Sequence, residues 1–289
     1  MKYEGMIYRP PSEAYSLIVQ ITVGCSHNNC TFCTMYKDKS FRIKSLDEIF
    51  DDFRDAYNRY GDNIRRIFLA DGDALIVKTD ELLEILNFIK KTFPSTQRVS
   101  SYGTPGDILR KSEDELRALA EAGLDMVYMG AESGDEETLK AINKGVTVRE
   151  IAEAGKKLRR CGIKLSVTFI SGLGGRARKT EHAIQSARLV SEMNPEYVGF
   201  LTLMLDPSTE IYRQIEAGEM ELLRPYEIAE EMKLFLSNVD SPNTIFRSNH
   251  ASNYIALGGT LNDDIPKMLR QIEETEKANA YRSEYFRSL

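Results

Sequence analysis

The stretch Ser16–Cys33 reads SLIVQITVGCSHNNCTFC and places three cysteines directly after a short apolar run. The apolar run, residues 16–22, predicts a β-strand. Cys25, Cys30 and Cys33 follow on one short loop, and the chain has only one other cysteine. Three thiolates on such a loop are typical of a metal centre that keeps one position open for chemistry. We therefore expect this loop to be the active site.

The composition sets limits on the class of protein. A chain of 289 residues suits one large α/β domain or two small ones, and its 42% hydrophobic content allows a sizeable core. The net charge of −6 argues against a basic nucleic-acid binder, although a local basic groove is compatible with it. No apolar run is long enough to span a bilayer, and the N-terminus lacks a signal-peptide pattern. We expect a cytoplasmic protein, because metal thiolates persist in a reducing compartment.

Strand and helix patterns alternate along the first two-thirds of the chain. Six such alternations predict an α/β fold with a parallel sheet and right-handed crossovers. No low-complexity linker divides the chain, so we expect one domain, with a core over residues 1–205 and a mostly helical extension over 206–289. The predicted strands of the core are 16–22, 66–69, 97–102, 126–129, 165–170 and 197–205, and two of the helices begin with capping boxes at Ser45 and Ser112.

Polar or glycine-rich segments follow four of the predicted strands. The cysteine loop follows the first strand, and Asp71-Gly72-Asp73 follows the second. Glu132-Ser133 follows the fourth strand, and residues 171–175 follow the fifth. Because the C-terminal ends of parallel strands meet at one rim of a sheet, we expect these segments to form one site.

These motifs resemble those of the radical S-adenosylmethionine (SAM) superfamily. The family loop has three cysteines with an aromatic residue before the last, as in Cys30-Thr31-Phe32-Cys33, although the first gap here is one residue longer than usual. Residues 130–134 (GAESG) are similar to the fourth-strand motif of the Elp3-like and MiaB-like branches. The resemblance covers roughly the first two-thirds of the chain. It implies a partial (β/α)6 barrel of the TIM type.

The resemblance also implies cofactors and ligands. Cys25, Cys30 and Cys33 would ligate a [4Fe-4S] cluster whose remaining iron binds SAM. Reductive cleavage of SAM would then give a 5′-deoxyadenosyl radical, with a flavodoxin- or ferredoxin-type protein as external electron donor. Phe32 would lie against the adenine of SAM.

Further cofactor contacts follow from the same resemblance. Asp71-Gly72-Asp73 occupies the place of the family motif that contacts the SAM amino group. Glu132, with Ser133 beside it, would accept hydrogen bonds from the ribose hydroxyls. Gly172 would let the backbone approach the nucleoside. Apart from the resemblance, Arg176 and Arg178 follow the glycine segment in the chain and could hold the SAM carboxylate.

Each of these roles has an alternative. The cysteines could bind zinc if His27 or His250 supplied a fourth ligand. Asp71-Gly72-Asp73 could be a turn without a ligand, and Arg178 could be a solvated surface residue. Ser133 or Asp135 could mainly cap the helix that follows.

A polar cluster at residues 247–254 lies outside the family motifs. It includes Asn249 and His250, which are candidate catalytic residues at the substrate end of the barrel. The alternative is that His250 is satisfied by bonds within its own turn. We expect His182 to lie at a helix start on the surface, and Cys161 to be a small buried filler.

The function predicted from these features is a radical SAM enzyme that acts on an unidentified small molecule. A tRNA-modifying enzyme is the alternative within the same class, and the acidic charge balance disfavours it. An iron–sulfur electron carrier or sensor without catalysis is the alternative from another class. It differs in that SAM would leave its cluster unchanged.

Overall fold

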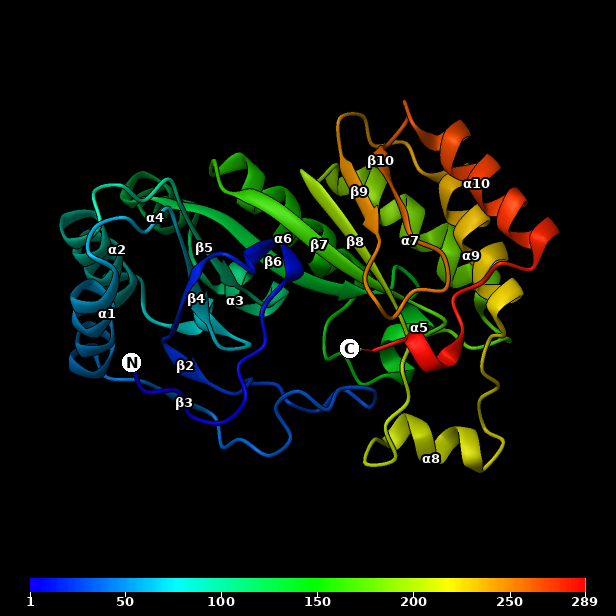
Figure 1. Cartoon of the computed structure of the whole chain (residues 1–289), viewed down its shortest axis with the longest axis horizontal. Coiled ribbons are helices and arrows are strands. Elements are labelled where there is room, and N and C mark those ends of the chain that lie inside the picture. The colour runs from blue at the N-terminus through cyan, green and yellow to red at the C-terminus, as the bar shows by residue number, and fades with distance from the viewer. Residues whose placement is uncertain (289) are drawn as a thin grey trace. The chain divides into compact units, whose positions relative to one another are not determined.

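The computed structural model describes residues 1–288, and its central feature is a sheet of eight strands (Figure 1). The strands pair in the order β1-β4-β5-β6-β7-β8-β9-β10. The pairs β1–β4, β4–β5, β5–β6, β7–β8 and β8–β9 are parallel, and the pair β9–β10 is antiparallel. The α/β class with a parallel sheet is therefore confirmed. The strands are β1 Leu17–Gln20, β4 Arg66–Ala70, β5 Arg98–Tyr102, β6 Leu124–Glu132, β7 Lys164–Ser171, β8 Tyr197–Thr202, β9 Ile245–Ser248 and β10 Leu257–Thr260.

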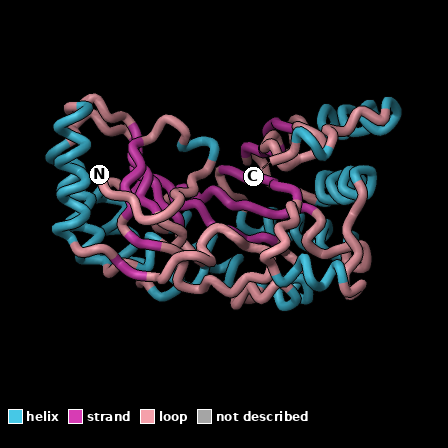
Figure 2. The backbone as a smooth tube through the Cα atoms, turned by 60° about the horizontal axis from the view of Figure 1, so that its bottom comes forward, coloured by secondary structure: helices cyan, strands magenta, loops and turns pink. Residues whose placement is uncertain are grey.

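One or two helices separate most successive strands of the sheet along the chain. Figure 2 distinguishes the helices, in cyan, from the strands, in magenta. Both predicted capping boxes are present, since Ser45 accepts from the Glu48 N–H and Ser112 from the Glu115 N–H, with each glutamate bonding back. Within residues 1–288 no helix is both long and apolar enough to cross a membrane. The helices are α1 Leu46–Tyr60, α2 Thr79–Thr92, α3 Pro105–Arg110, α4 Glu113–Ala122, α5 Glu136–Ala141, α6 Val148–Arg160, α7 Lys179–Met193, α8 Glu210–Glu216, α9 Pro225–Asn238 and α10 Ile265–Ala278.

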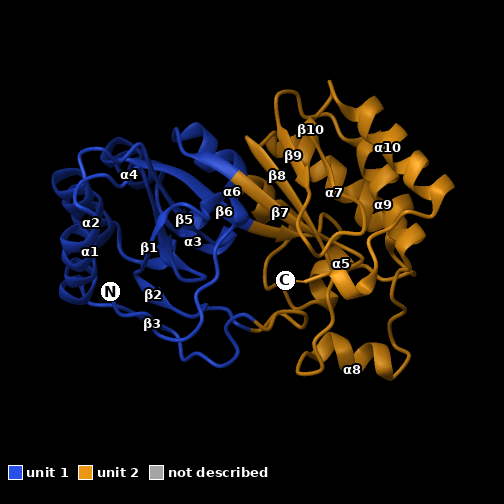
Figure 3. Cartoon of the chain, in the orientation of Figure 1, with its two compact units in different colours: residues 1–28, 35–129, 154–165 blue, residues 29–34, 130–153, 166–289 orange. Residues whose placement is uncertain are grey.

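The chain forms two compact units (Figure 3). Unit 1 comprises Met1–Asn28, Met35–Met129 and Ala154–Leu165. Within it, α2 packs against both α1 and α4, and Phe68 of β4 stacks edge-on against Tyr102 of β5. A small antiparallel ribbon, β2 (Thr22–Val23) with β3 (Arg42–Ile43), also belongs to this unit.

Unit 2 comprises Asn29–Thr34, Gly130–Glu153 and Ser166–Leu289. Within it, α9 packs against both α7 and α10. Four buried phenylalanines connect the strands to α9, because Phe200 of β8 contacts Phe169, Phe235 and Phe246. The C-terminal part of the chain is therefore built onto the sheet by a continuous aromatic core.

The C-terminal extension contains more strand than its sequence predicts. It includes β9, which pairs in parallel with β8. β10 was not predicted, because its sequence LGGT contains two glycines and glycine is depleted in strands. α3 was also missed, and it begins at Pro105 after the N-cap Thr104. The expected division of the chain at residue 205 stays a prediction.

Candidate functional site

The cysteine loop follows β2 and contributes residues to both units. Cys25 belongs to unit 1, whereas Cys30 and Cys33 belong to unit 2. Within the described residues none of the three cysteines forms a disulfide, and all three are partly exposed. The Cys33 N–H donates to the Cys30 carbonyl over 3.4 Å, which closes a turn between these two cysteines.

Backbone hydrogen bonds hold the second half of the loop. The Thr31 N–H donates to the Ile142 carbonyl over 3.0 Å, and the Thr31 carbonyl accepts from the Ile211 N–H over 3.1 Å. The Asn143 side-chain amide donates to the Asn29 carbonyl over 3.1 Å. The ends of α5 and α8 thus fix the part of the loop that carries Cys30 and Cys33.

Two carboxylates from the segment after β4 hold the first half of the loop. The Gly24 N–H donates to Asp71 Oδ2 over 3.1 Å, and the Ser26 hydroxyl donates to Asp73 Oδ2. Both aspartates are fully buried. Asp71 and Asp73 therefore flank Cys25 through its two neighbours in the sequence.

The two carboxylate oxygens of Asp71 differ in their hydrogen bonds to the described residues. Oδ2 accepts from Lys39 Nζ over 2.7 Å and from Gln20 Nε2 over 3.1 Å, in addition to the Gly24 N–H. Lys39 and Asp71 form an ion pair with side chains 4% and 0% exposed. Within the described part of the chain, Asp71 Oδ1 has no hydrogen bond of ordinary length. Buried carboxylate oxygens are normally paired, so Oδ1 is a candidate ligand-binding atom.

Asp73 lies beside a second buried carboxyl group. Burial first, and then the neighbouring Asp107 carboxyl, raise the pKa of Asp73, while the bond from Ser26 opposes them. Asp107 itself accepts from the Thr104 hydroxyl and from Arg110. Asp73 Oδ1 lacks a hydrogen bond of ordinary length among residues 1–288. The pair therefore retains a proton more readily than two separate carboxylates would.

The ring of Tyr36, a residue that sequence reasoning missed, leaves room only for glycine at position 72. A Cβ atom at position 72 would lie 2.4 Å from Cε2 of Tyr36. The Tyr36 ring is buried and also packs edge-on against Tyr8, with 5.6 Å between ring centroids. No side chain larger than hydrogen fits between Gly72 and this ring.

The end of β6 folds its glutamate back on the strand. Glu132 has a positive φ of 65°, and its Oε1 pairs with Lys144 Nζ over 2.9 Å. A Cβ at Gly130 would meet Glu132 Oε1 at 2.1 Å, so the motif glycine leaves room for the carboxylate. The side chains of Glu132 and Lys144 remain 12% and 14% exposed.

The Ser133–Asp135 segment packs into α7 and caps α5. The Gly134 N–H donates to the Ser186 hydroxyl over 2.8 Å. Asp135 is the N-cap of α5, because it accepts from the Thr138 N–H, and the capping alternative is confirmed for this residue. Arg178 donates to both Asp135 oxygens over 2.6 and 2.7 Å. Burial alone would raise the pKa of Asp135, but the hydrogen bonds outweigh it and lower the pKa to about 2.

The glycine loop after β7 is fixed from α9. Gly172 has a φ of +83°, and its N–H donates to Glu231 Oε1 over 2.9 Å. The Gly172 carbonyl in turn accepts from the Gly175 N–H over 3.1 Å. Glu231 is 2% exposed. A carboxyl group from the C-terminal extension thus holds the loop that was predicted to approach the nucleoside.

His182 is buried, so its predicted surface position is wrong. It is 1% exposed, because α7 begins at Lys179, so His182 lies within the first turns of the helix and belongs to its buried face. Nδ1 lies 2.8 Å from the Ser133 hydroxyl, and Nε2 lies 3.9 Å from Glu231 Oε1. Burial lowers the pKa of His182 to about 4, although Asp135 and the Ile170 carbonyl oppose the shift.

The polar cluster around His250 is bonded within its own turn. His250 Nδ1 lies 3.0 Å from the Ser252 hydroxyl and accepts from the Ser252 N–H over 3.1 Å. Burial and then the charge of Arg282 lower the pKa of His250, while Asn249 is exposed. Asn253 attaches the turn to β8 by donating to the Phe200 carbonyl over 2.8 Å. These bonds are those of the local-turn alternative for His250.

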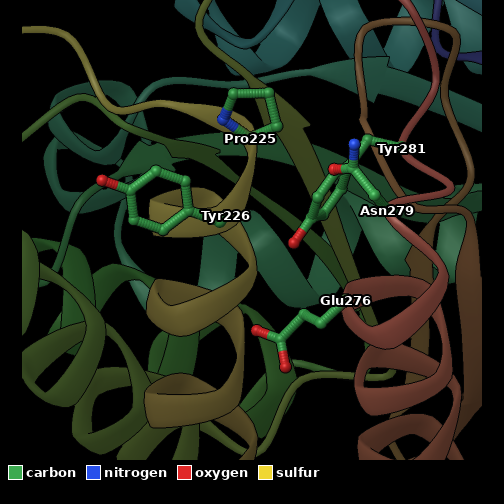
Figure 4. Close-up of a pocket in the computed structure, with 5 residues that line it drawn as sticks. All are labelled: Pro225, Tyr226, Glu276, Asn279 and Tyr281. Atoms are coloured by element: carbon green, nitrogen blue, oxygen red, sulfur yellow. The ribbon is translucent and has the colours of Figure 1, made fainter.

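A cavity of about 300 Å³ lies at the start of α9 and the end of α10 (Figure 4). It is lined by Pro225, Tyr226, Glu276, Asn279 and Tyr281. Glu276 pairs there with Lys233 over 2.8 Å. None of these residues belongs to the polar segments that follow the strands, so this cavity is not part of the candidate site.

The comparison with known families decides the class of the protein. The sequence profile of the radical SAM superfamily matches residues 19–187, which include the cysteine loop and the strand-end motifs from Asp71 to Gly175. The chain belongs to the radical SAM superfamily. The predicted family is therefore confirmed, while the Elp3-like and MiaB-like branch stays a prediction.

Relatives of this radical SAM protein have different names and lengths. It is 20% identical to the heme chaperone HemW of Bacillus subtilis over 62% of this chain and 47% of HemW. It is 24% identical to the uncharacterized protein MJ0486 of Methanocaldococcus jannaschii over 93% of this chain and 80% of MJ0486. The chain thus spans about half the length of HemW and most of MJ0486.

A solved structure agrees with the fold of this radical SAM protein. The methyltransferase TsrM of Kitasatospora setae superimposes with a TM-score of 0.55 and 19% identity, over 70% of this chain and 39% of TsrM. At that identity the likeness concerns the fold alone, and it confirms the partial-barrel architecture.

The residues of this radical SAM protein suit a cluster and a polar ligand. Cysteine thiols are the donors that an iron–sulfur cluster requires, and these three are partly exposed. Within residues 1–288 no three His, Cys, Asp or Glu side chains are placed to hold a single metal ion. Asp71 Oδ1, Asp73 Oδ1 and the Ser101 hydroxyl lie buried without hydrogen bonds of ordinary length among the described residues. Such atoms are typical of the lining of a polar ligand site.

Proposed function

We propose that this chain is a radical SAM enzyme that carries a [4Fe-4S] cluster on Cys25, Cys30 and Cys33. The observation that carries the proposal is the cysteine loop itself, whose three cysteines lie inside the matched family region and, among the described residues, form no disulfide. When bound, the cluster supplies an electron that cleaves SAM reductively to a 5′-deoxyadenosyl radical. A thiolate is the form of cysteine that ligates iron.

The chain's own contribution is to hold the loop and the cofactor. Asp71 Oδ2 and Asp73 Oδ2 orient Gly24 and Ser26 on either side of Cys25. The remaining Oδ1 atoms of these two aspartates are the proposed acceptors for the SAM ammonium group, with Gly72 giving close access between them. Phe32, which is partly buried, would supply an apolar face for the adenine.

The loops after β6 and β7 are proposed to bind the nucleoside. Glu132 would accept from the ribose hydroxyls while it is held by Lys144, and Ser133 and Gly172 would shape the adjoining backbone. Arg178 remains a candidate for the SAM carboxylate. Two of its donors are taken by Asp135, so such a contact would use the other N–H groups of the guanidinium.

The proposed substrate is a small molecule. The net charge of −6 disfavours binding to a nucleic-acid backbone and thus a tRNA substrate. Asn249 and His250 are the proposed substrate contacts. Asn249 is exposed and His250 is only partly buried, so both are accessible beside the end of β8. An external flavodoxin- or ferredoxin-type donor and a cytoplasmic location complete the proposal, since the loop needs reduced thiols.

Electron paramagnetic resonance tests the proposal directly. The anaerobically reconstituted protein is reduced with dithionite and measured with and without SAM. We expect a cluster signal that shifts when SAM is added, because SAM would bind the iron that has no protein ligand. A signal that is indifferent to SAM would favour the electron-carrier alternative, and zinc without iron would favour a structural metal site.

A further inference from the structure

A buried acid from the C-terminal extension reaches the glycine loop of the core. Glu231 lies on α9, outside the matched family region of residues 19–187. Its Oε1 accepts from the Gly172 N–H over 2.9 Å, and burial of the residue leaves it 2% exposed. Within the described residues its other oxygen, Oε2, has no hydrogen bond of ordinary length.

A buried histidine continues this contact to a second loop. His182 Nε2 lies 3.9 Å from Glu231 Oε1, and His182 Nδ1 lies 2.8 Å from the Ser133 hydroxyl. Ser133 also accepts from the Asp135 N–H over 2.9 Å. Glu231 and His182 thus lie between Gly172, on the loop after β7, and Ser133, on the loop after β6.

The arrangement of serine, histidine and glutamate is not that of a hydrolase. Ser133 is 0% exposed, so its hydroxyl cannot attack a substrate. The gap of 3.9 Å between His182 and Glu231 is also too long for a direct hydrogen bond, although a small movement would close it. A structural and orienting role agrees with both observations.

Both side chains are uncharged near neutral pH. Burial raises the pKa of Glu231 to about 8, against the opposing effects of the Gly172 N–H, the Ser171 hydroxyl and Lys179. Burial likewise lowers the pKa of His182 to about 4. The pair therefore avoids the large cost of two unscreened charges in the interior. A neutral carboxyl group also keeps one donor, which can bond to the imidazole.

We propose that Glu231 and His182 are positioning residues that hold the loops after β6 and β7 in the conformation that binds SAM. The inference rests on the proposed function, because it concerns the SAM site of that function. It assigns a role in cofactor binding to the C-terminal extension, which lies beyond the family motifs. Neither residue needs to touch SAM, since each acts through Gly172 or Ser133.

Three variants of the cluster-loaded protein test the positioning role. Glu231→Ala removes the acceptor of the Gly172 N–H, whereas Glu231→Gln keeps a neutral acceptor of the same shape. Glu230→Ala is the matched control, because Glu230 is the neighbouring residue on α9, with a side chain 46% exposed and paired with Lys179. The readouts are the dissociation constant of SAM, the iron content and the melting temperature.

We expect Glu231→Ala to weaken SAM binding by about 10-fold or more at unchanged iron content, as loss of a buried hydrogen-bond partner predicts. Glu231→Gln and Glu230→Ala should stay within about 2-fold of the unaltered protein. Equal SAM affinity in the unaltered protein and Glu231→Ala would overturn the positioning role alone. An unaltered protein that holds a cluster but does not bind SAM would overturn the proposed function and this inference together.

Nitrogen NMR gives a test that does not depend on the cluster or on a destabilised variant. The chain has three histidines and 19 glycines, so selective 15N labelling of these two residue types gives few signals to assign. We expect the His182 ring to stay neutral at pH 5.5, and the Gly172 amide signal to move more in Glu231→Gln than in Glu230→Ala. A His182 ring that is protonated at that pH, or a Gly172 amide that responds equally to both variants, would overturn the inference.

Discussion

Glu231 Oε1 lies 3.9 Å from His182 Nε2, and the two side chains are 3% and 1% exposed. The shifts in their pKa values have opposite effects on stability. Between pH 4.5 and about 8, Glu231 keeps its proton in the folded chain but has released it in the unfolded chain. The unfolded chain binds a proton on histidine below pH 6.5, whereas folded His182 binds one only below about 4. The two effects oppose each other up to pH 6.5, and above it only Glu231 contributes.

The first prediction is therefore a loss of stability between pH 6.5 and 8 that depends on Glu231. In this window the free energy of unfolding should fall by about 1.4 kcal/mol per pH unit from this group. Glu231→Gln cannot ionise and should lack this part of the slope. Chemical denaturation at pH 6.5, 7.2 and 8 measures both proteins. Asp135, with a pKa of about 2, does not titrate in this window, and Lys179 faces the pair in both proteins.

The difference between the two proteins isolates Glu231, because all other ionisable groups are shared. Parallel slopes in the unaltered protein and Glu231→Gln would contradict the assignment of a protonated Glu231. His182→Gln provides a complementary control, since it should steepen the fall in stability between pH 4.5 and 6.5 by removing the opposing effect.

The second prediction concerns the ion pair of Lys39 and Asp71. Asp71→Asn leaves the Lys39 ammonium buried without its counter-charge, and such losses typically cost about 3–5 kcal/mol. Denaturant unfolding of the protein without cofactors gives the measurement. The double change Asp71→Asn with Lys39→Met should recover a large part of that loss, because it removes both charges together. A double variant that is as unstable as Asp71→Asn would show that the Gly24 and Gln20 bonds, rather than the charge, carry the effect.

The third prediction tests the contact between Gly72 and Tyr36. Gly72→Ala places a methyl group 2.4 Å from the Tyr36 ring, so it should lower the free energy of unfolding by about 1–3 kcal/mol. Gly106→Ala is the control. Its new methyl group inside α3 would lie 3.8 Å from the Arg110 and Thr104 side chains, an ordinary contact, so the change should be neutral or stabilising. Combining Gly72→Ala with Tyr36→Ala should relieve the clash. A melting temperature that is lower for Gly106→Ala than for Gly72→Ala would contradict this interpretation.

The sequence predicted the strands and their terminal motifs because these are local patterns. Buried apolar runs mark β4 to β8, and each polar segment follows its strand directly in the chain. The family profile agrees with the motifs, although the assigned contacts of Asp71, Glu132 and Gly172 with SAM stay predictions. The pattern could not show that one oxygen of Asp71 is occupied by the protein itself, because Lys39 has no motif of its own.

The contacts that sequence reasoning missed connect distant segments. Gly172 and Glu231 are 59 residues apart, and Ser133 and His182 are 49 apart. Glu231 lies on an amphipathic helix where a glutamate usually faces solvent, so no periodicity marks it as buried. His182 was placed on the surface because its helix was predicted to begin there, and the true start at Lys179 turns the ring inward. A boundary error of less than one turn was enough to reverse its burial.

The last prediction tests the proposed cluster ligands. Cys30→Ala should abolish cluster assembly, because a [4Fe-4S] cluster held by two thiolates has lost a required ligand. Cys161→Ala is the matched control. This thiol is 4% exposed on unit 1, its pKa is raised chiefly by burial, and it lies outside the cysteine loop, so its loss should leave the iron content unchanged. Iron and sulfide analysis after anaerobic reconstitution measures both variants. Full iron and sulfide in Cys30→Ala would remove Cys30 from the ligand set, and a loss of iron in Cys161→Ala alone would move the centre to another part of the chain.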